Sequence, residues 1–189
     1  MPQLVRTVVW RRLDQPCAEY GALWSDEPGW QLRGTMVGAL NGTPLKVRYG
    51  VLCDGHWHTL AAHLALRTGP TEQVLHLRVD RDRRWWKAGE ELVTVRDCVD
   101  IDLAITPATN TLPIRRLGLE IGASARVRAA WVRFPELTIE PLEQTYTRLT
   151  DTRYGYRSDS FHAELDVDDL GLVREYSRGW VREADFNAG

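Results

Sequence analysis

Alternation of apolar and polar residues with a period of two runs along most of the chain, and it limits the fold more than any other feature. It is clearest in four segments: 45–51, 75–79, 99–105 and 161–167. Successive side chains of a strand point to opposite faces, so each segment offers one face to a core and one to water. That pattern is typical of antiparallel sheets. The sequence therefore predicts a mainly β fold.

Turn signals separate these segments. Asn41-Gly42 and Asp54-Gly55 predict hairpins, since Gly and its Asn or Asp neighbour tolerate the positive φ of a tight turn. Pro28-Gly29, Gly89 and Gly122 mark further breaks. No helical pattern, internal repeat or linker intervenes, and 189 residues suffice for one well-buried core. We expect residues 1–189 to form a single domain built on one large, curved antiparallel sheet.

The exception is the segment 106–118, which predicts one short helix from about 110 to 117. Thr109 or Asn110 can cap its start, and Pro113 falls in the first turn, where its missing N–H costs little. Gly118 is a natural stop. The apolar residues of this segment do not share one narrow stripe: Leu112, Ile114 and Leu117. A helix apolar on several sides is surrounded by protein, so we expect the sheet to enclose it.

Arg115 and Arg116 of this helix need partners, because an unpaired buried guanidinium would cost several kcal/mol. Asp100 and Asp102, on the polar face of the preceding strand, are the candidates. One interpretation is an ion-pair network that anchors the helix. The other is a pair of arginines that bind a phosphate or sugar-acid head group.

Composition narrows the class of protein. The net charge of −2 gives no global attraction to nucleic acid or anionic membranes. No apolar run is long enough to span a membrane, and no secretory signal is recognisable, so the prediction is a cytoplasmic protein. Cys17, Cys53 and Cys98 are widely spaced without a C-x-x-C, as expected of reduced, partly buried thiols.

Motifs that could carry chemistry are weak. Asp100-Ile101-Asp102 resembles the D-x-D of glycosyltransferases but lacks a nucleotide-binding framework, and His56 and His58 share a face without a third metal ligand. Cys98 has no placed histidine, and neither a nucleophile elbow nor a phosphate loop occurs. We therefore predict no catalytic residue, metal or cofactor. The basic and Trp-rich segment 81–87 fits a hairpin tip whose tryptophans pack back on the core, with membrane-surface contact as the alternative and nucleic acid a distant third.

The segment Thr106-Pro107-Ala108-Thr109-Asn110-Thr111-Leu112-Pro113-Ile114-Arg115-Arg116, preceded by Cys98-Val99-Asp100-Ile101-Asp102-Leu103, resembles the Putative glycolipid-binding family of bacterial proteins. Matches continue downstream at Trp131-Val132, Pro135-Glu136-Leu137, Gln144-Thr145-Tyr146, Tyr154 with Tyr156, and the run 168–173. The resemblance implies a spiral β-roll, a long sheet wrapped around one α-helix, that forms dimers. It also implies glycolipid binding, an inference from fold.

On this basis we expect a non-catalytic protein that binds a glycolipid or lipid in an apolar groove of the roll. Each buried CH₂ is worth about 0.8 kcal/mol against an association cost of roughly 4–15 kcal/mol, so about ten or more carbons must be buried. The candidate ligand-binding residues are Trp57, Asp100, Asp102, Asn110, Arg115, Arg116, Trp131 and Tyr146. Two alternatives stay open: an enzyme that acts on a sugar or lipid head group through the charged cluster around 100–116, and a structural or assembly dimer without a small ligand.

Overall fold

All strands among the described residues belong to one continuous, open sheet. The computed structural model describes residues 1–159 and 161–188. Across the described residues the sheet has 15 strands in the order β8-β7-β6-β5-β4-β3-β2-β1-β15-β14-β13-β12-β11-β10-β9. The prediction of a mainly β fold with one large sheet is confirmed.

The N-terminal half forms a broad layer of antiparallel hairpins. Its strands are β1 (Gln3–Arg12), β2 (Cys17–Asp26), β3 (Gly29–Leu40), β4 (Thr43–Cys53), β5 (Thr59–Thr68) and β6 (Thr71–Val79), with the short β7 (Trp85–Lys87) and β8 (Glu90–Glu91) at the edge. Asn41-Gly42 joins β3 to β4 with φ of 50° and 80°, as the hairpin prediction requires. Asp54-Gly55 opens the longer turn before β5.

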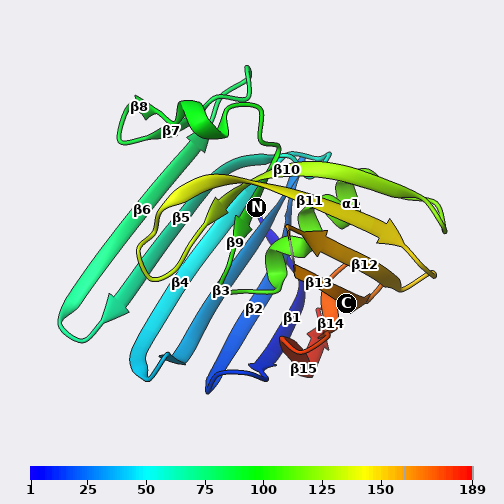
Figure 1. The fold of residues 1–189 in the computed structure, drawn as a ribbon, viewed down its shortest axis with the longest axis horizontal. Helices are drawn as coiled ribbons and strands as arrows, with labels where there is room; N and C mark the ends of the chain where they lie inside the picture. Colours follow the sequence, from blue (N-terminus) through cyan, green and yellow to red (C-terminus); the bar gives the residue numbers. More distant parts are fainter. Residues whose placement is uncertain (160, 189) are drawn as a thin grey trace.

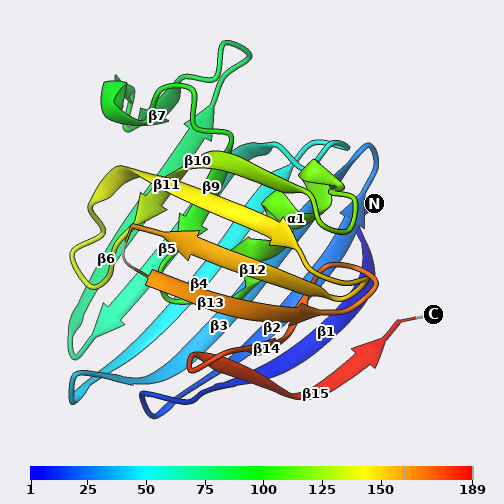
Figure 2. The same ribbon diagram turned by 45° about the vertical axis from the view of Figure 1, so that its right-hand side comes forward.

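The C-terminal half returns across this layer. Its strands are β9 (Asp100–Leu103), β10 (Ser124–Val132), β11 (Ile139–Arg148), β12 (Arg153–Ser158), β13 (Phe161–Val167), β14 (Val173–Tyr176) and β15 (Trp180–Asn187). β15 pairs with β1 and so joins the halves, whereas β9 and β10 pair in parallel, a departure from the antiparallel pattern. Figures 1 and 2 show β10–β13 crossing in front of β2–β6, so the sheet rolls back over itself.

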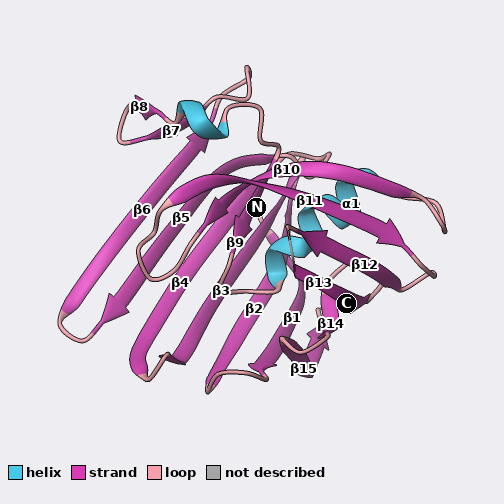
Figure 3. Cartoon of the chain, viewed as in Figure 1, coloured by secondary structure: helices cyan, strands magenta, loops and turns pink. Residues whose placement is uncertain are grey.

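The helical segment lies inside this roll (Figure 3). The 3-10 turn η2 (Ala108–Asn110) leads into α1 (Thr111–Leu117), which confirms the expected helix, and Gly118 ends it with φ of 52°. Asn110 makes no capping bond, because η2 continues directly into the helix. A second 3-10 turn, η1 (Val93–Val95), lies at the far edge of the sheet.

Side chains fill the space between the layers. One buried cluster joins the inner face of β1–β7 to β9 and η2, and a second joins α1 to β11–β14. The indole N–H groups of Trp10 and Trp85 donate to the backbone oxygens of Val173 and Cys98, over 2.8 and 2.9 Å. The interior is thus a packed core, anchored at both ends by tryptophans.

Of the two tryptophans in the segment 81–87, Trp85 packs back on the core as expected, whereas Trp86 is half-buried and donates its indole N–H to the Asp80 carboxylate over 2.9 Å. Trp85 is fully buried, and the Arg84 guanidinium pairs with the Asp80 carboxylate at 2.9 Å. All three cysteines are buried and free. Among the described residues no helix is long and apolar enough to cross a membrane.

Candidate functional site

Strand β9 carries two carboxylates into the interior of the roll. Asp100 is fully buried and Asp102 is half-buried. The alternation in the sequence predicts that both carboxylates lie on the polar, exposed face of a strand. For Asp100 this prediction is wrong, because its side chain is buried. The reason is that β9 lies inside the roll, so protein covers both of its faces.

Asp100 is held by the helix. The Arg116 guanidinium donates Nε and Nη2 to its two carboxylate oxygens, over 3.0 and 2.5 Å. Burial raises the pKa of the Asp100 carboxyl, and the bonds and charge of Arg116 oppose that rise. A bidentate pair of this kind fixes geometry as well as charge. The predicted anchoring of the helix by an Asp–Arg pair is present at this position.

Asp102 has no cationic partner. Its Oδ2 accepts a hydrogen bond from Gln144 Nε2 at 2.5 Å, and no ion pair among the described residues involves it. Desolvation raises the pKa of Asp102 to about 6, the Gln144 bond opposes the rise, and the neighbouring Asp100 carboxylate adds to it. A half-buried carboxylate with one neutral partner keeps acceptor capacity for a ligand.

Aromatic residues lie on the strands around this carboxylate. The parallel register sets Asp102 opposite Trp131 of β10, so both leave the sheet on the same face. Burial raises the pKa of the Tyr156 and Tyr176 phenols, and the charge of the nearby Asp102 contributes to both rises. Phe161, half-exposed at the start of β13, stacks on Tyr176 with centroids 6.3 Å apart.

A second hydrogen-bonded pair ties the helix start to the same strand as Gln144. The Tyr146 hydroxyl donates to Asn110 Oδ1 at 2.9 Å, and the Tyr146 ring meets Tyr156 edge-on with centroids 5.2 Å apart. We call this assembly the Asp102 site. Its members are Asp102, Gln144, Trp131, Tyr156, Tyr176 and Phe161, backed by the pairs Asp100–Arg116 and Asn110–Tyr146.

Two predicted residues lie elsewhere. Arg115 leaves the helix on another side and donates to the backbone oxygen of Asp169 at 3.2 Å. Its guanidinium also lies 5.7 Å from the ring centroid of Trp57, which is buried and stacked on Trp30. Arg115 and Trp57 therefore meet each other in the structure, away from the interactions that define the Asp102 site.

Four members of the Asp102 site were not predicted from the sequence as site residues: Gln144, Tyr156, Tyr176 and Phe161. A signal was available for Gln144, because it alternates with Tyr146 along β11 and so shares its face. Tyr176 and Phe161 come from strands that meet only through the rolled sheet, and no local pattern connects them with Asp102.

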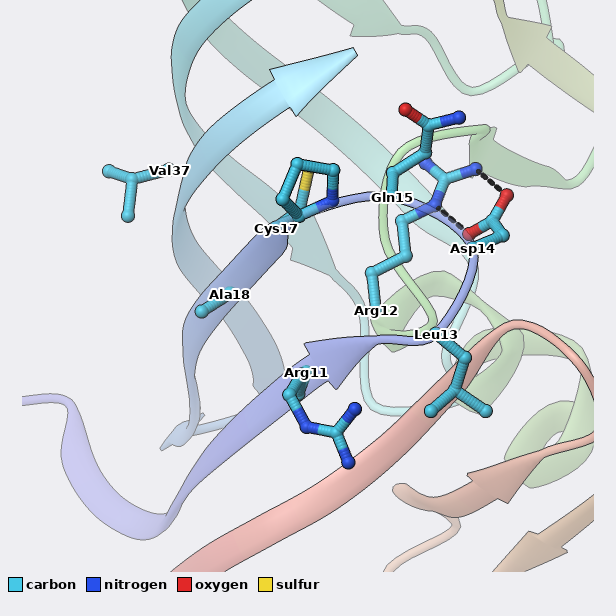
Figure 4. A pocket seen from close by; sticks show the side chains of 9 residues that line it. Arg11, Arg12, Leu13, Asp14, Gln15, Cys17, Ala18 and Val37 are labelled. Carbon is cyan, nitrogen blue, oxygen red and sulfur yellow. Dashed lines mark hydrogen bonds and ion pairs between the residues drawn. The ribbon is translucent and has the colours of Figure 1, made fainter. Parts of the chain in front are cut away.

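The cavities that we find lie away from this site. One of about 590 Å³ is an open depression at the turn between β1 and β2, lined by charged residues such as Arg11 and Asp14 and by apolar residues such as Leu13 and Val37 (Figure 4). Another of about 220 Å³ lies beside the C-terminal end of α1. Neither is a deep apolar groove. Within the described residues no group of three or more His, Cys, Asp or Glu could hold a metal ion.

The chemistry of the Asp102 site suits a polyhydroxylated ligand. The carboxylate accepts hydrogen bonds, and the side-chain amides of Gln144 and Asn110 can both donate and accept them. The aromatic rings offer apolar faces. A sugar has the matching combination of hydroxyl groups and an apolar ring face. The arrangement can bind and orient such a ligand without any covalent step.

Comparisons with known proteins agree with the fold. The model of a family described as Putative glycolipid-binding matches residues 7–182. The crystal structure of a DUF1089 family protein from Pseudomonas aeruginosa is 34% identical, with a TM-score of 0.76; the match covers 84% of this chain and 88% of that chain. No curated protein matches this chain.

Proposed function

Since this chain belongs to the Putative glycolipid-binding family, we propose that it is a non-catalytic protein that binds a glycolipid by its sugar head group at the Asp102 site. The observation that carries the proposal is Asp102 itself. It is a half-buried carboxylate bonded to one amide, on the same face as Trp131. A partly desolvated acceptor beside an aromatic ring is a common arrangement in small-ligand sites.

Because the interior of the roll is packed, we do not propose that it buries the acyl chains of a glycolipid. Two clusters of buried side chains fill the roll, and the larger of the cavities described above is an open depression at the turn between β1 and β2. A chain of about ten carbons would have to displace core side chains, at a cost of several kcal/mol. We therefore assign recognition to the head group and leave the acyl chains outside the roll.

Titration with a soluble glycolipid tests the proposal. Isothermal calorimetry with a short-chain alkyl glycoside measures binding, and an alkyl chain of equal length without the sugar is the control ligand. Asp102→Asn keeps the shape but removes the charge, and we expect affinity to fall at least about tenfold, the loss of one charge-assisted hydrogen bond.

Glu143→Gln is the matched control variant, because Glu143 is an exposed carboxylate on the same strand as Gln144. It should bind like the unmodified protein. Equal binding of the sugar-free chain, or no change on Asp102→Asn, would contradict the proposal.

A second candidate is an enzyme that acts on a sugar or lipid head group. The raised pKa of Asp102, about 6, favours it, because a general acid or base needs a pKa near the working pH. Turnover of a panel of glycosides, lost on Asp102→Asn with a pH profile that breaks near 6, would support this candidate over simple binding.

Assembly and location are part of the proposal as well. We propose a cytoplasmic homodimer, as the family resemblance and the sequence suggest. Sedimentation at micromolar concentration tests the dimer, and fractionation of cells tests the location. A dimer without any bound small molecule would favour the purely structural alternative.

A further inference from the structure

The outward-pointing residues of β3–β6 form a continuous surface, which we call the outer face. The register aligns them in cross-strand rows. One row is Thr35, Arg48, Ala65 and Val74, and the next is Val37, Lys46, Arg67 and Glu72. Tyr20 of β2 continues the first row, opposite Thr35. In Figures 1 and 2 these strands form the layer farthest from β10–β13.

This face is strongly basic, although the chain as a whole is slightly acidic. Across β3–β6 its outward positions carry one carboxylate, Glu72, and five exposed cations: Arg33, Lys46, Arg48, Arg67 and Arg78. The chain has 24 basic and 26 acidic residues in total, so acid is in excess over the rest of the molecule. Such an asymmetry orients a protein against an anionic surface.

Most of these cations have no carboxylate partner, although Arg33 donates to Gln31 and lies 5.0 Å from the ring centroid of Trp24. Arg67 pairs with Glu72 at 3.1 Å, whereas no ion pair in the described part of the chain involves Arg33, Lys46, Arg48 or Arg78. The centre of the face is also hollowed. A cavity of about 240 Å³ there is lined by Lys46, Arg48, Ala65, Arg67 and Glu72. Three cations around one concavity fit a phosphate group.

Apolar side chains stand between the cations. Tyr20, Val37 and Val74 are 54%, 50% and 54% exposed. Val37 lies directly opposite Lys46, and Val74 lies in the same row as Arg48. Cations that contact head groups, alternating with apolar groups that enter the interface beneath them, are the features of a peripheral membrane surface.

We propose that the outer face docks the protein on an anionic phospholipid membrane, with the cavity of Lys46, Arg48 and Arg67 holding a lipid phosphate. This inference is independent of the Asp102 site, which lies on the other side of the β3–β6 layer. It would bring a glycolipid-binding protein to the surface where its ligand is presented.

Two other partners fit the face less well. A second copy of the chain would place the cations of one copy against the same cations of the other in a two-fold contact, which is repulsive. A single-stranded nucleic acid would use aromatic rings for stacking, but the most exposed apolar residues here include two valines.

Co-sedimentation with vesicles tests the proposal. Vesicles of phosphatidylcholine alone are compared with vesicles that contain about a third phosphatidylglycerol. We expect binding only to the anionic vesicles and a strong decrease in binding at high salt. Each cation near such a surface changes the partition constant about fivefold, so Lys46→Glu with Arg48→Glu should weaken it by roughly 25-fold or more.

The matched control is Arg126→Glu with Arg157→Glu, the same change of charge at exposed positions of β10 and β12. It should leave vesicle binding within about threefold of the unmodified protein, since these residues lie outside the outer face. Thermal melts of both double variants check that they fold, and Asp102→Asn should bind vesicles normally.

Three outcomes would overturn the proposal: equal binding to both kinds of vesicle, equal loss in the two double variants, or tight binding of single-stranded oligonucleotides without vesicle binding. If only the outer-face variant changed the oligomeric state and vesicles did not bind, the face would be an interface between copies instead.

Discussion

Asp168 and Asp102 are both interior carboxylates, but the protein treats them differently. The Asp168 carboxylate accepts hydrogen bonds from three donors, one of them Arg6, and forms a further ion pair with Arg182, whereas Asp102 has one donor, the neutral amide of Gln144. A fully partnered carboxylate has nothing left to offer a ligand. A carboxylate with one neutral partner costs stability and keeps free acceptor capacity, so we expect Asp168 to act in stability and Asp102 to act in the proposed ligand binding.

The contacts of Asp168 join both ends of the chain. Arg6 of β1 and Arg182 of β15 lie 2.5 and 2.9 Å from its Oδ2, and the backbone N–H groups of Leu170 and Leu172 donate to its Oδ1. The cluster therefore fastens the seam where the two halves of the sheet meet. Its role follows from its position alone.

Glu19 lies between Asp168 and Asp102 in how fully its carboxylate is partnered. It is buried on the inner face of β2, and Tyr49 and Thr106 both donate to its Oε1, over 2.5 and 2.8 Å. Its Oε2 has no partner in the described structure, and no cation pairs with it. Burial raises the pKa of Glu19 to about 7, and the two hydrogen bonds oppose the rise.

We expect the largest loss of stability from substitution of Asp168, the carboxylate with the most partners. Asp168→Asn removes the buried counter-charge shared by the Arg6 and Arg182 guanidinium groups and leaves them only the more exposed Asp169 and Asp185, which should lower the free energy of unfolding by about 3–5 kcal/mol. Urea denaturation measures it. Asp169→Asn is the control, since this carboxylate also contacts Arg6 but its side chain is 72% exposed, and it should cost less than about 1 kcal/mol. Equal losses of stability in Asp168→Asn and Asp169→Asn would contradict the structural role of Asp168.

The next effect concerns pH and Glu19. Because its folded pKa, about 7, lies above the ordinary value of 4.5, its contribution to stability is complete below pH 4.5 and is lost as pH rises through 7. The free energy of unfolding of Glu19→Gln relative to the unmodified protein should therefore rise by about 3 kcal/mol from pH 4.5 to pH 8. A difference that is flat with pH would show that Glu19 ionises normally.

A smaller effect is expected at the pair behind the Asp102 site. Arg116→Lys keeps the positive charge but loses the two-point contact with Asp100, which should lower the free energy of unfolding by about 2 kcal/mol. Arg115→Lys is the control, because Arg115 is exposed and bonds only to a backbone oxygen. Chemical denaturation of both variants provides the comparison, and an equal loss would mean that Asp100 does not anchor the helix.

The smallest effect on stability is expected at Asp102. Asp102→Asn removes a carboxylate whose charge is poorly compensated, so the free energy of unfolding at pH 7 should change by less than about 1 kcal/mol. Sugar binding should nevertheless fall at least about tenfold, as proposed above. A large loss of stability would place Asp102 with Asp168, among the structural carboxylates.

The sequence predicted some of the structure around the Asp102 site. The helix, its enclosure by the sheet and the Asp–Arg pair that holds it followed from the pattern around residues 98–118, and Asp100–Arg116 is present. The choice of Arg116 over Arg115 was not predictable. Both follow Ile114 in one turn, and only the position of β9 decides which guanidinium reaches a carboxylate.

Trp131 and Trp57 show the same limit of prediction from sequence, because the structure places them in different surroundings. Both are tryptophans near turns or strand ends, and the sequence proposed both as ligand residues. The parallel register of β9 and β10 puts Trp131 beside Asp102, whereas Trp57 stacks on Trp30 in the core. Pairing between strands is a long-range contact, and local periodicity does not encode it.

The sequence by itself therefore determined the mainly β class, several of the strands and turns, and the helix at about 110–117. These follow from residues close along the chain, through alternation, glycine turns and helix ends. Only the tertiary structure decided which carboxylates are saturated and which stay available. Burial and hydrogen-bond partners depend on how the halves of the sheet roll over each other, so Asp102 became distinct only when Gln144, Trp131 and the tyrosines of β12 and β14 gathered around it.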